Sequence, residues 1–229
     1  MTTSPEAAAT VAELTGLLLG DDHEHVHGPF RRLAADRRFH PDQEAAPDER
    51  VAASYERLRL LNGSVDALAL ATDPYRLAAA HEWTAPLDGA LAVVTGIHYN
   101  LFLGSLLDHT PHEKRPLDDY AAMRRIGTFL CTELGHGNDA AALETTAVYD
   151  PDSRTFTLHT PSAAAQKFMP NTSMAGGPKD AVVAARLIVA GRDRGIFLFL
   201  VPCRTSTACC PASRCARCPG APAARWTTA

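Results

Sequence analysis

The chain has 229 residues, of which 46% are hydrophobic and 21% are charged, and its formal net charge is -4. This length accommodates one large domain or two small ones, and the apolar content is sufficient for a buried core. The small and scattered negative charge leaves no basic face of the kind that neutralises phosphates, so nucleic acid is not expected as a partner.

Targeting and membrane signals are not evident in the sequence. No uninterrupted apolar run approaches the ~20 residues of a membrane span, and the amino terminus lacks a basic region followed by an apolar one. These patterns predict a cytoplasmic protein without a membrane span. Lysine is rare beside abundant alanine and arginine, which suggests GC-rich codons and a bacterial source.

The first half of the chain is predicted to be helical. A serine–proline pair at 4–5 is typical of a helix start, and apolar residues then recur at amphipathic helical spacing to Leu18. Further helices are predicted over 29–38 and 47–61, and another is predicted to begin after Asp73 by the same capping chemistry.

Three alternating histidines at 23, 25 and 27 raise the possibility of a metal site. In a strand, this alternation would place all three side chains on one face. Gly28 and Pro29 follow at once and no partner strand is evident. A solvated connection between helices is therefore favoured over a metal site.

The longest run with apolar periodicity covers 86–107 and predicts the buried helix of an amino-terminal bundle. This run carries His98, Tyr99 and Asn100. Polar groups satisfied within a helical core are favoured over a catalytic role for these residues. A last short helix is expected to end at Arg125.

Helical periodicity disappears after Gly127, and strand-like runs alternate with turns from there on. The expected strands form two hairpins, one from 144–149 and 155–160, the other from 181–189 and 195–202 with a turn at 191–195. The predicted fold class is α+β, with a helical bundle at 1–125 followed by an antiparallel β-domain at 126–203.

A polar, glycine-punctuated loop, Thr132-Glu133-Leu134-Gly135-His136-Gly137-Asn138, precedes the first hairpin. Its glycines allow a ligand to approach the backbone closely, although a short glycine motif alone is weak evidence. Further blocks follow in order: Leu143-Glu144-Thr145-Thr146-Ala147, Tyr149-Asp150-Pro151, and Lys167 with Pro170. Together these blocks resemble the acyl-CoA oxidases, flavoenzymes of the acyl-CoA dehydrogenase superfamily, over about 14–202.

The resemblance implies FAD-dependent α,β-dehydrogenation of fatty acyl-CoA in fatty acid β-oxidation, with electrons passed to oxygen. In such a reaction a base takes the α proton and the flavin takes the β hydride. Family members have a second helical bundle after the β-domain, and the full-length protein is expected to be a homodimer. That carboxy-terminal bundle is absent from this sequence.

The resemblance also assigns cofactor-binding residues. Thr132 stands where the family's threonine bonds the flavin ring, and its hydroxyl and backbone N–H are suitable donors; a threonine that merely ends a strand is the alternative. Gly137 would help to shape the turn beneath the flavin and admit the CoA pyrophosphate. Asn171 occupies the position of a flavin-contacting glycine, so this contact is open, although a backbone N–H would serve from either residue.

The resemblance assigns fewer substrate-binding residues and no catalytic residue. Asn138 falls where many relatives have a small hydroxyl residue, and its amide is a candidate for hydrogen bonding to substrate. Phe168 and Met169 replace two tryptophans, so chain-length preference does not carry over. His136 is expected to pack and bond within the loop, and no geometry makes Glu133 a base. The family's catalytic glutamate lies in the absent bundle, so no catalytic residue is assigned and the chain is expected to be an inactive fragment.

The tail, 204–229, holds most of the cysteines. Cys209 and Cys210 with Cys215 and Cys218 resemble a zinc knuckle in their spacing. The favoured interpretation is an aberrant, frameshifted tail, because re-reading GC-rich codons one base earlier turns every cysteine from Cys209 onward into valine or leucine. No metal site is therefore assigned.

Two alternative functions stand beside the oxidase. One is an acyl-CoA dehydrogenase that passes electrons to a carrier protein, which Gly135-His136-Gly137 disfavours because dehydrogenases usually have other residues there. The other is a non-enzymatic module whose cysteine-rich tail binds zinc. Peroxide release and metal content, respectively, would distinguish them.

Overall fold

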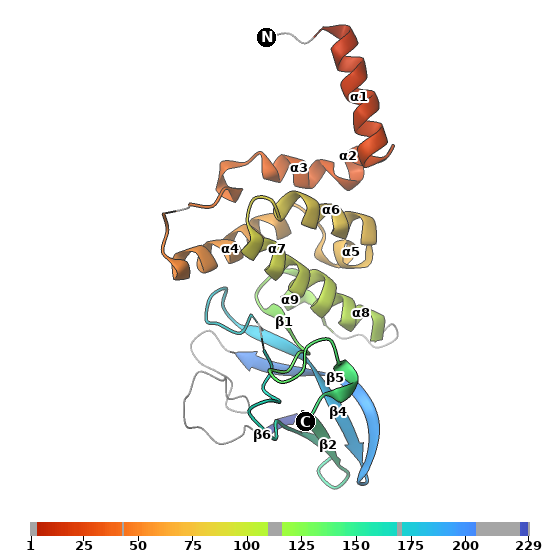
Figure 1. Ribbon diagram of the computed structural model, residues 1–229, viewed down its shortest axis with the longest axis vertical. Helices are drawn as coiled ribbons and strands as arrows, with labels where there is room; N and C mark the ends of the chain where they lie inside the picture. The colour runs from red at the N-terminus through yellow and green to blue at the C-terminus, as the bar shows by residue number, and fades with distance from the viewer. Residues whose placement is uncertain (1–3, 43, 110–115, 169–170, 205–224, 229) are drawn as a thin grey trace. The chain divides into compact units, whose positions relative to one another are not determined.

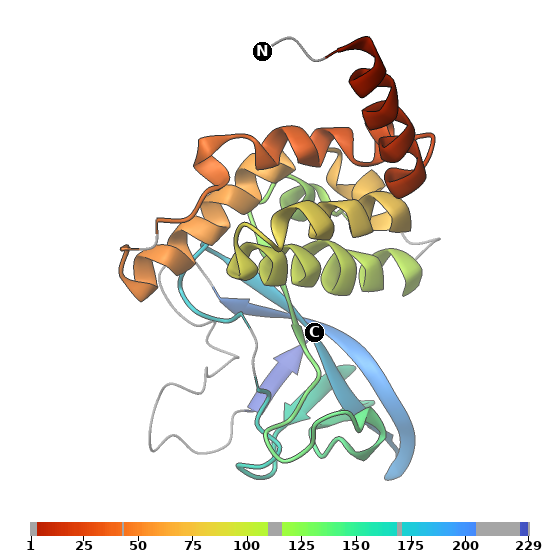
Figure 2. The same cartoon turned by 45° about the horizontal axis from the view of Figure 1, so that its top comes forward.

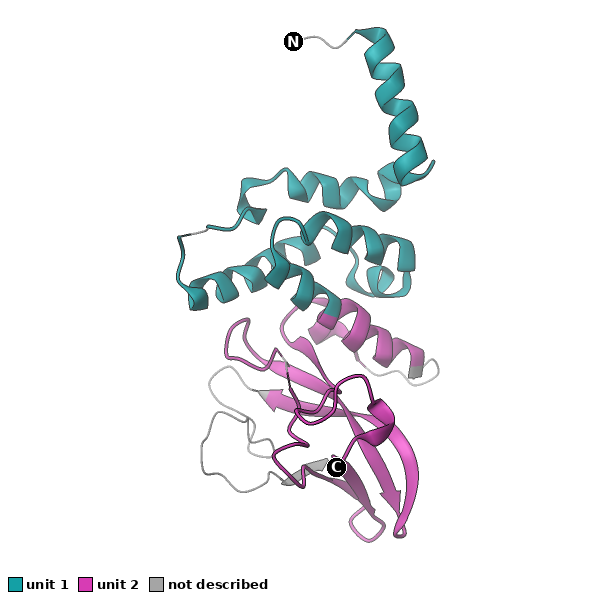
Figure 3. Cartoon of the chain, viewed as in Figure 1, with its two compact units in different colours: residues 1–96 teal, residues 97–229 magenta. Residues whose placement is uncertain are grey.

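The computed structural model describes residues 4–42, 44–109, 116–168, 171–204 and 225–228 (Figure 1). The chain divides into two compact units, residues 1–96 and 97–229 (Figure 3). This division falls within the long apolar helix, whereas the sequence placed a domain boundary after residue 125. The predicted boundary stays a prediction.

The first unit is helical. Its elements are α1 (Pro5–Leu19), α2 (His23–Val26), α3 (Gly28–Ala34), the 3-10 helix η1 (Arg37–Phe39), α4 (Pro47–Asn62), α5 (Ala67–Thr72), α6 (Pro74–Thr84) and α7 (Gly89–Thr95). Side-chain caps begin several of them, because an oxygen accepts from backbone N–H groups that lack helical partners. Ser4 caps α1 and Asp73 caps α6, which confirms both predicted starts.

Aromatic and leucine side chains fill the core of the first unit, including Phe30, Phe39, Tyr55, Leu58, Leu61, Leu70 and Leu91. Arg57 joins the surrounding segments, because its guanidinium donates to the backbone carbonyls of Arg38 and His40 and to the Asp88 carboxylate. In α1, which the structure describes throughout, no residue is buried. The apolar spacing of α1 therefore predicted a helix correctly, but this helix packs no face against a core.

The long apolar run forms a single helical stretch. It continues from α7 through the π-helical η2 (Gly96–Gly104) into α8 (Ser105–His109). Gly89–Asp108 is the one helix of the described residues long and apolar enough to cross a membrane, with a mean hydropathy of 1.6, which the sequence analysis did not anticipate. In the most apolar 18-residue segment of this helix, 44% is buried within the protein. The length and composition of the helix therefore do not establish that it spans a membrane.

The second unit contains a mixed sheet. Its strands are β1 (Ile126–Leu130), β2 (Thr146–Asp150), β3 (Thr155–His159), β4 (Lys179–Val189), β5 (Arg192–Arg204) and β6 (Arg225–Thr228). The order is β1-β4-β2-β3-β6, and β5 also pairs with β4. Two short helices, α9 (Asp118–Ala121) and the 3-10 helix η3 (Ala140–Ala142), complete the described elements.

The sheet differs from the antiparallel domain that the sequence predicted. β1 and β2 both run parallel to β4, whereas β2–β3, β3–β6 and β4–β5 are antiparallel. The hairpins were recognised from local turns, but the parallel pairs join segments far apart in sequence. Local patterns carry no signal for such pairs.

The two longest strands, β4 and β5, run side by side (Figure 2). The turn between them is tighter than predicted. Val189 pairs with Arg192, so the turn is Ala190-Gly191, both with positive φ. Two residues with positive φ match the twist of a hairpin. Gly195, which the sequence placed in the turn, instead lies in β5, where the β4–β5 pairing shifts register.

The start of β1 is held by the helical segment of its own unit. A Cβ at Gly127 would lie 2.1 Å from the Phe102 ring, so only glycine permits this approach. The Gly127 N–H donates to Nδ1 of His98 at 3.0 Å. Burial lowers the pKa of His98 to about 4, opposed in part by the Tyr120 backbone. His98 is thus a neutral hydrogen-bond acceptor in a packed core. The predicted full satisfaction of its polar atoms is not met, because its Nε2 is buried without a hydrogen-bond partner, and Asn100 is exposed.

Candidate functional site

The predicted ligand loop follows β1 directly and pairs with the segment after β3. Leu134 N donates to Gln166 O at 2.8 Å, and Gly135 N donates to Ala164 O at 2.8 Å. Phe168 N donates to Thr132 O at 2.9 Å. Glu133 and Lys167 face each other as an antiparallel bridge. We call this two-stranded piece, residues 132–135 with 164–168, the ribbon.

An ion pair lies on the buried face of the ribbon. Lys167 Nζ donates to a Glu133 carboxylate oxygen at 3.0 Å and to the Cys131 carbonyl at 2.9 Å. The Glu133 carboxylate also accepts from the backbone N–H of Glu144 at 2.8 Å and of Thr145 at 2.9 Å. The Glu133 side chain is fully buried and that of Lys167 is 8% exposed. Glu133 therefore joins the ribbon to the start of the β2–β3 hairpin.

The charge states follow from these contacts. Burial alone would raise the pKa of Glu133, but hydrogen bonds from Thr145, from the Glu144 backbone and from Lys167 together hold that pKa below its usual value. Burial lowers the pKa of Lys167, and Glu133 opposes that effect. A carboxylate with its charge satisfied in this way is a poor proton acceptor. The structure therefore gives Glu133 a structural role.

The opposite face of the ribbon is exposed. Because side chains alternate along an extended segment, the residues flanking the ion pair emerge together on this face; they are Thr132, Leu134, Gln166 and Phe168, and all four are exposed. Leu134 and Phe168 keep 57% and 52% of their surface open. Among the described residues, the Thr132 hydroxyl has no hydrogen-bond partner. We call these four residues the exposed face.

The two glycines of the loop differ in what they permit. A Cβ at Gly135 would lie 2.9 Å from the Cβ of Ala164, so glycine is required there by the close pairing of the ribbon. A Cβ at Gly137 would meet nothing within 4 Å, and Gly137 lacks a positive φ. Packing therefore does not require glycine at position 137. Next to it, Asn138 is exposed and has a φ of 56°, a conformation that asparagine tolerates better than most residues.

His136 is held within the loop. Its Nε2 lies 3.1 Å from a Glu144 carboxylate oxygen, and the other oxygen accepts from Ser162 Oγ at 3.1 Å. The hydrogen bond with His136, followed by that from Ser162, lowers the pKa of Glu144. The predicted packing and bonding role of His136 fits this geometry.

Asn171 lies beside β1. Its side-chain oxygen accepts from the Thr128 hydroxyl, and its amide nitrogen donates to the Gly127 carbonyl at 3.5 Å. The side chain is therefore directed at the strand that leads to Thr132. The assignment of Asn171 to the flavin site stays a prediction.

Sequence reasoning placed Thr132, Gly137 and Asn138 in one loop, and the structure keeps them together there. The pairing of Glu133 with Lys167 was not predicted from the sequence. These two residues are far apart in sequence, and nothing local marks them as partners. The alternation of exposed Thr132 and Leu134 about Glu133 is compatible with the pairing, but it does not identify the second segment.

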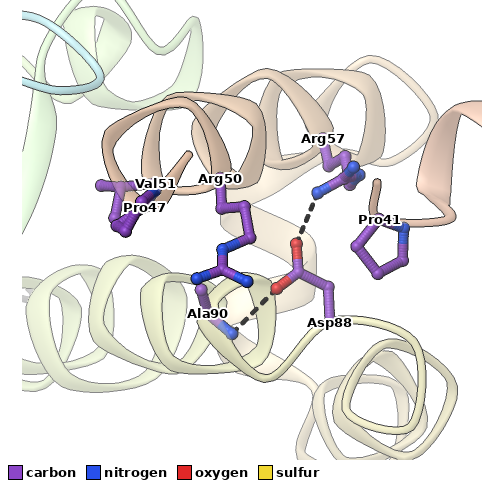
Figure 4. A pocket seen from close by; sticks show the side chains of 7 residues that line it. All are labelled: Pro41, Pro47, Arg50, Val51, Arg57, Asp88 and Ala90. Carbon is purple, nitrogen blue, oxygen red and sulfur yellow. Dashed lines mark hydrogen bonds and ion pairs between the residues drawn. The ribbon is translucent and has the colours of Figure 1, made fainter. Parts of the chain in front are cut away.

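The first unit contains a pocket of about 300 Å³ between the start of α4 and the start of α7. Figure 4 shows its lining: Pro41, Pro47, Arg50, Val51, Arg57, Asp88 and Ala90. Arg57 and Asp88 form an ion pair at 2.7 Å, and Asp88 Oδ1 accepts from Ala90 N at 2.9 Å. None of the predicted site residues lines this pocket.

Metal ligands are not gathered within the described parts of the chain, where no group of three or more His, Cys, Asp or Glu side chains could hold an ion. His23 and His25 lie in α2, where alternation does not place side chains on one face. The tail cysteines from Cys209 to Cys218 lie outside the described residues.

Comparisons with known proteins agree on one family. No protein-family model matches the chain. The chain is 35% identical to peroxisomal acyl-coenzyme A oxidase 1 from Homo sapiens over 111 residues, which are 48% of this chain and 17% of that protein. It therefore covers well under two thirds of the length of this relative.

Solved structures give the same result over more of the chain. Acyl-CoA oxidase 1 from Yarrowia lipolytica matches with a TM-score of 0.72 and 25% identity, over 88% of this chain and 30% of that one. Acyl-CoA oxidase-2 from Caenorhabditis elegans, solved with FAD, ascaroside-CoA and ATP, matches with a TM-score of 0.67 and 20% identity, over 91% and 33%. The resemblance to the acyl-CoA oxidase family and the α+β fold class are confirmed.

Proposed function

From this family resemblance, we propose that the second unit provides part of the FAD and fatty acyl-CoA site of an acyl-CoA oxidase. The observation that carries the proposal is the exposed face of the ribbon, with the Thr132 hydroxyl directed away from the buried Glu133–Lys167 pair. Beside it, Gly137 offers open space that neither packing nor φ explains. A ligand that approaches the backbone closely would explain a glycine at this position.

The residues present fit FAD in two respects. The Thr132 hydroxyl is an available donor, and Gly137 leaves room for a close approach. FAD, when bound, would supply the electron acceptor for oxidation of the acyl chain, with oxygen as the final acceptor. The FAD bound in the C. elegans relative is consistent with this assignment.

The chain's own groups would bind and orient. Thr132 would donate to a ring acceptor, and Leu134 and Phe168 would shield the adjacent surface from water. The exposed amide of Asn138 could hydrogen-bond an acyl-CoA group. Glu133 and His136 are both engaged within the protein, so neither is assigned to proton transfer.

The proposal is tested by titrating the full chain with FAD and following flavin fluorescence. We expect Thr132→Val to weaken FAD binding by about tenfold, because a buried ring acceptor loses its donor. Thr157→Val, on β3 and away from the ribbon, is the matched control and should leave the affinity unchanged. Equal FAD affinity of the wild-type chain and Thr132→Val, or no FAD binding by the wild-type chain, would contradict the proposal.

A further inference from the structure

The buried face of the ribbon explains how its exposed face is kept in place. We infer that Glu133 and Lys167 are positioning residues, whose ion pair sets the register of the ribbon and thereby holds Thr132 and Phe168 toward the ligand. This inference rests on the proposed function for the identity of the ligand. The register itself is a property of the protein and can be tested without it.

The ion pair connects the ribbon to two strands of the sheet. Lys167 Nζ reaches the carbonyl of Cys131, immediately after β1. The Glu133 carboxylate reaches the Thr145 N–H, and Thr145 O in turn accepts from Arg186 N, in β4, at 2.8 Å. The Thr145 hydroxyl donates to Ala165 O in the second segment of the ribbon at 3.2 Å. The ion pair and the Thr145 hydroxyl thus hold both segments of the ribbon against the end of β1 and the residue that precedes β2.

The side chains of the second segment specify this register only weakly. The second segment of the ribbon begins with Ala164-Ala165, and Ser162-Ala163 precede it. The small side chains of these four residues give no strong pattern of apolar and polar faces. Segments of that kind are prone to slip, and a slip of one residue moves every side chain to the other face. Such a slip would expose Lys167 and leave buried Glu133 without its charge partner. Because an unpaired buried charge is very unfavourable, the pair excludes the alternative register.

The consequence for a ligand follows from alternation. In the observed register, Thr132 lies opposite Phe168, and both side chains are on the exposed face. A slip would turn Phe168 inward and remove it from the Thr132 hydroxyl. Because small displacements of a contact group reduce binding and catalysis strongly, Glu133 and Lys167 would affect ligand binding without contacting the ligand.

Hydrogen exchange of the full chain tests the register directly. The informative backbone N–H groups are those of Leu134, Gly135 and Phe168, which close the ribbon, compared with Val182 in β4 as a reference. Glu133→Gln and Lys167→Met should each accelerate exchange of the ribbon groups about tenfold or more beyond the change at Val182, since a buried partner is left unsatisfied. In the double variant, the fold-acceleration of hydrogen exchange should be smaller than the product of the accelerations in the two single variants.

Glu144→Gln is the matched control, because Glu144 lies in the same region and bonds His136 and Ser162 from a partly exposed position. It should leave exchange of the ribbon groups unchanged. Equal exchange in Glu133→Gln and the wild-type chain would overturn the inference. So would an equal acceleration in Glu144→Gln.

Measurements of FAD affinity then distinguish two roles of Glu133: positioning Thr132 for the ligand, or stabilising the fold in general. If Glu133 acts through Thr132, adding Thr132→Val should cost about tenfold in affinity in the wild-type chain but little in Glu133→Gln. Faster ribbon exchange in Glu133→Gln with the full effect of Thr132→Val retained would overturn the positioning role. If the wild-type chain binds no FAD, the proposed function fails, and the exchange result alone decides the claim about register.

Discussion

Arg57 with Asp88 in the first unit, and Glu133 with Lys167 in the second, are ion pairs whose side chains are at most 9% exposed. Both pairs also bond backbone groups of neighbouring segments. Arg57 and Asp88 line a pocket, and every polar group that they contribute to it is used to hold the unit together. Glu133 and Lys167 hold the ribbon in place, and the face opposite them carries an unused hydroxyl.

In both units, the buried ion pair has a structural role, and its presence alone does not indicate a ligand site. Breaking such a pair leaves an uncompensated charge, so the pair specifies one arrangement strongly whatever lies nearby. A candidate site is found instead where the supported surface holds groups that folding does not use, such as Thr132 and Gly137. This distinction leads to three predictions.

The largest effect is expected for the pair in the first unit. Arg57→Met should lower the free energy of unfolding by about 3–5 kcal/mol, because it leaves buried Asp88 uncompensated. Arg50→Met, on an exposed arginine of the same pocket, should change it by less than about 0.5 kcal/mol. Urea unfolding measures both. Similar losses in the two variants would show that the pocket surface, and not the ion pair, is what matters to stability.

The second prediction concerns pH and the second unit. The pKa of His98 is lowered to about 4 in the folded protein, so below its unfolded pKa only the unfolded state gains a proton. Stability should therefore be constant above about pH 6.5 and fall by roughly 3 kcal/mol in total as the pH drops to about 4. Glu133, whose folded pKa is also lowered, adds a further loss only below the normal range for a glutamate.

The control for this pH effect is His98→Asn, which keeps an acceptor for the Gly127 N–H but does not titrate. Its stability should be lower overall and should fall much less than that of the wild-type chain between about pH 6.5 and 4.5, where the lowered pKa of His81 leaves a smaller loss. Thermal unfolding across this range gives the answer. A wild-type profile that is flat in the same interval would refute the buried, neutral state of His98.

The smallest effects separate the two glycines of the loop. Gly135→Ala should cost about 1–3 kcal/mol, because its Cβ would meet Ala164 in the ribbon. Gly137→Ala should stay within about 0.5 kcal/mol of the wild-type stability, yet weaken FAD binding. Unfolding and flavin titration of both variants test this. A stability loss at Gly137 equal to that at Gly135 would remove the argument that position 137 is open for a ligand.

Local chemistry made much of the fold predictable. Ser4 and Asp73 marked helix starts through capping, and the turn cluster at 150–153 marked the β2–β3 hairpin. The Ala190-Gly191 turn was misplaced because glycines at 191 and 195 both suit a turn, and only the register of β4 with β5 distinguishes them. The parallel pairs of β4 required contacts that no local pattern encodes.

The candidate site was predictable only in its loop. Thr132, Gly137 and Asn138 were predicted from family motifs, because each motif is contiguous in sequence, and their ligand roles stay predictions. Glu133 stood within the same motif, but its role depends on Lys167 and on the N–H groups of Glu144 and Thr145. Such a role arises only when distant segments are brought together, and it becomes visible in the structure.

The most direct test of the account is to map where FAD protects the full chain from hydrogen exchange. The account predicts protection at 132–138 in the second unit. It predicts none at the pocket beside Arg57 and Asp88 in the first unit. Protection at that pocket, or no protection at 132–138 at saturating FAD, would contradict the claim that the ligand site lies on the exposed face of the ribbon.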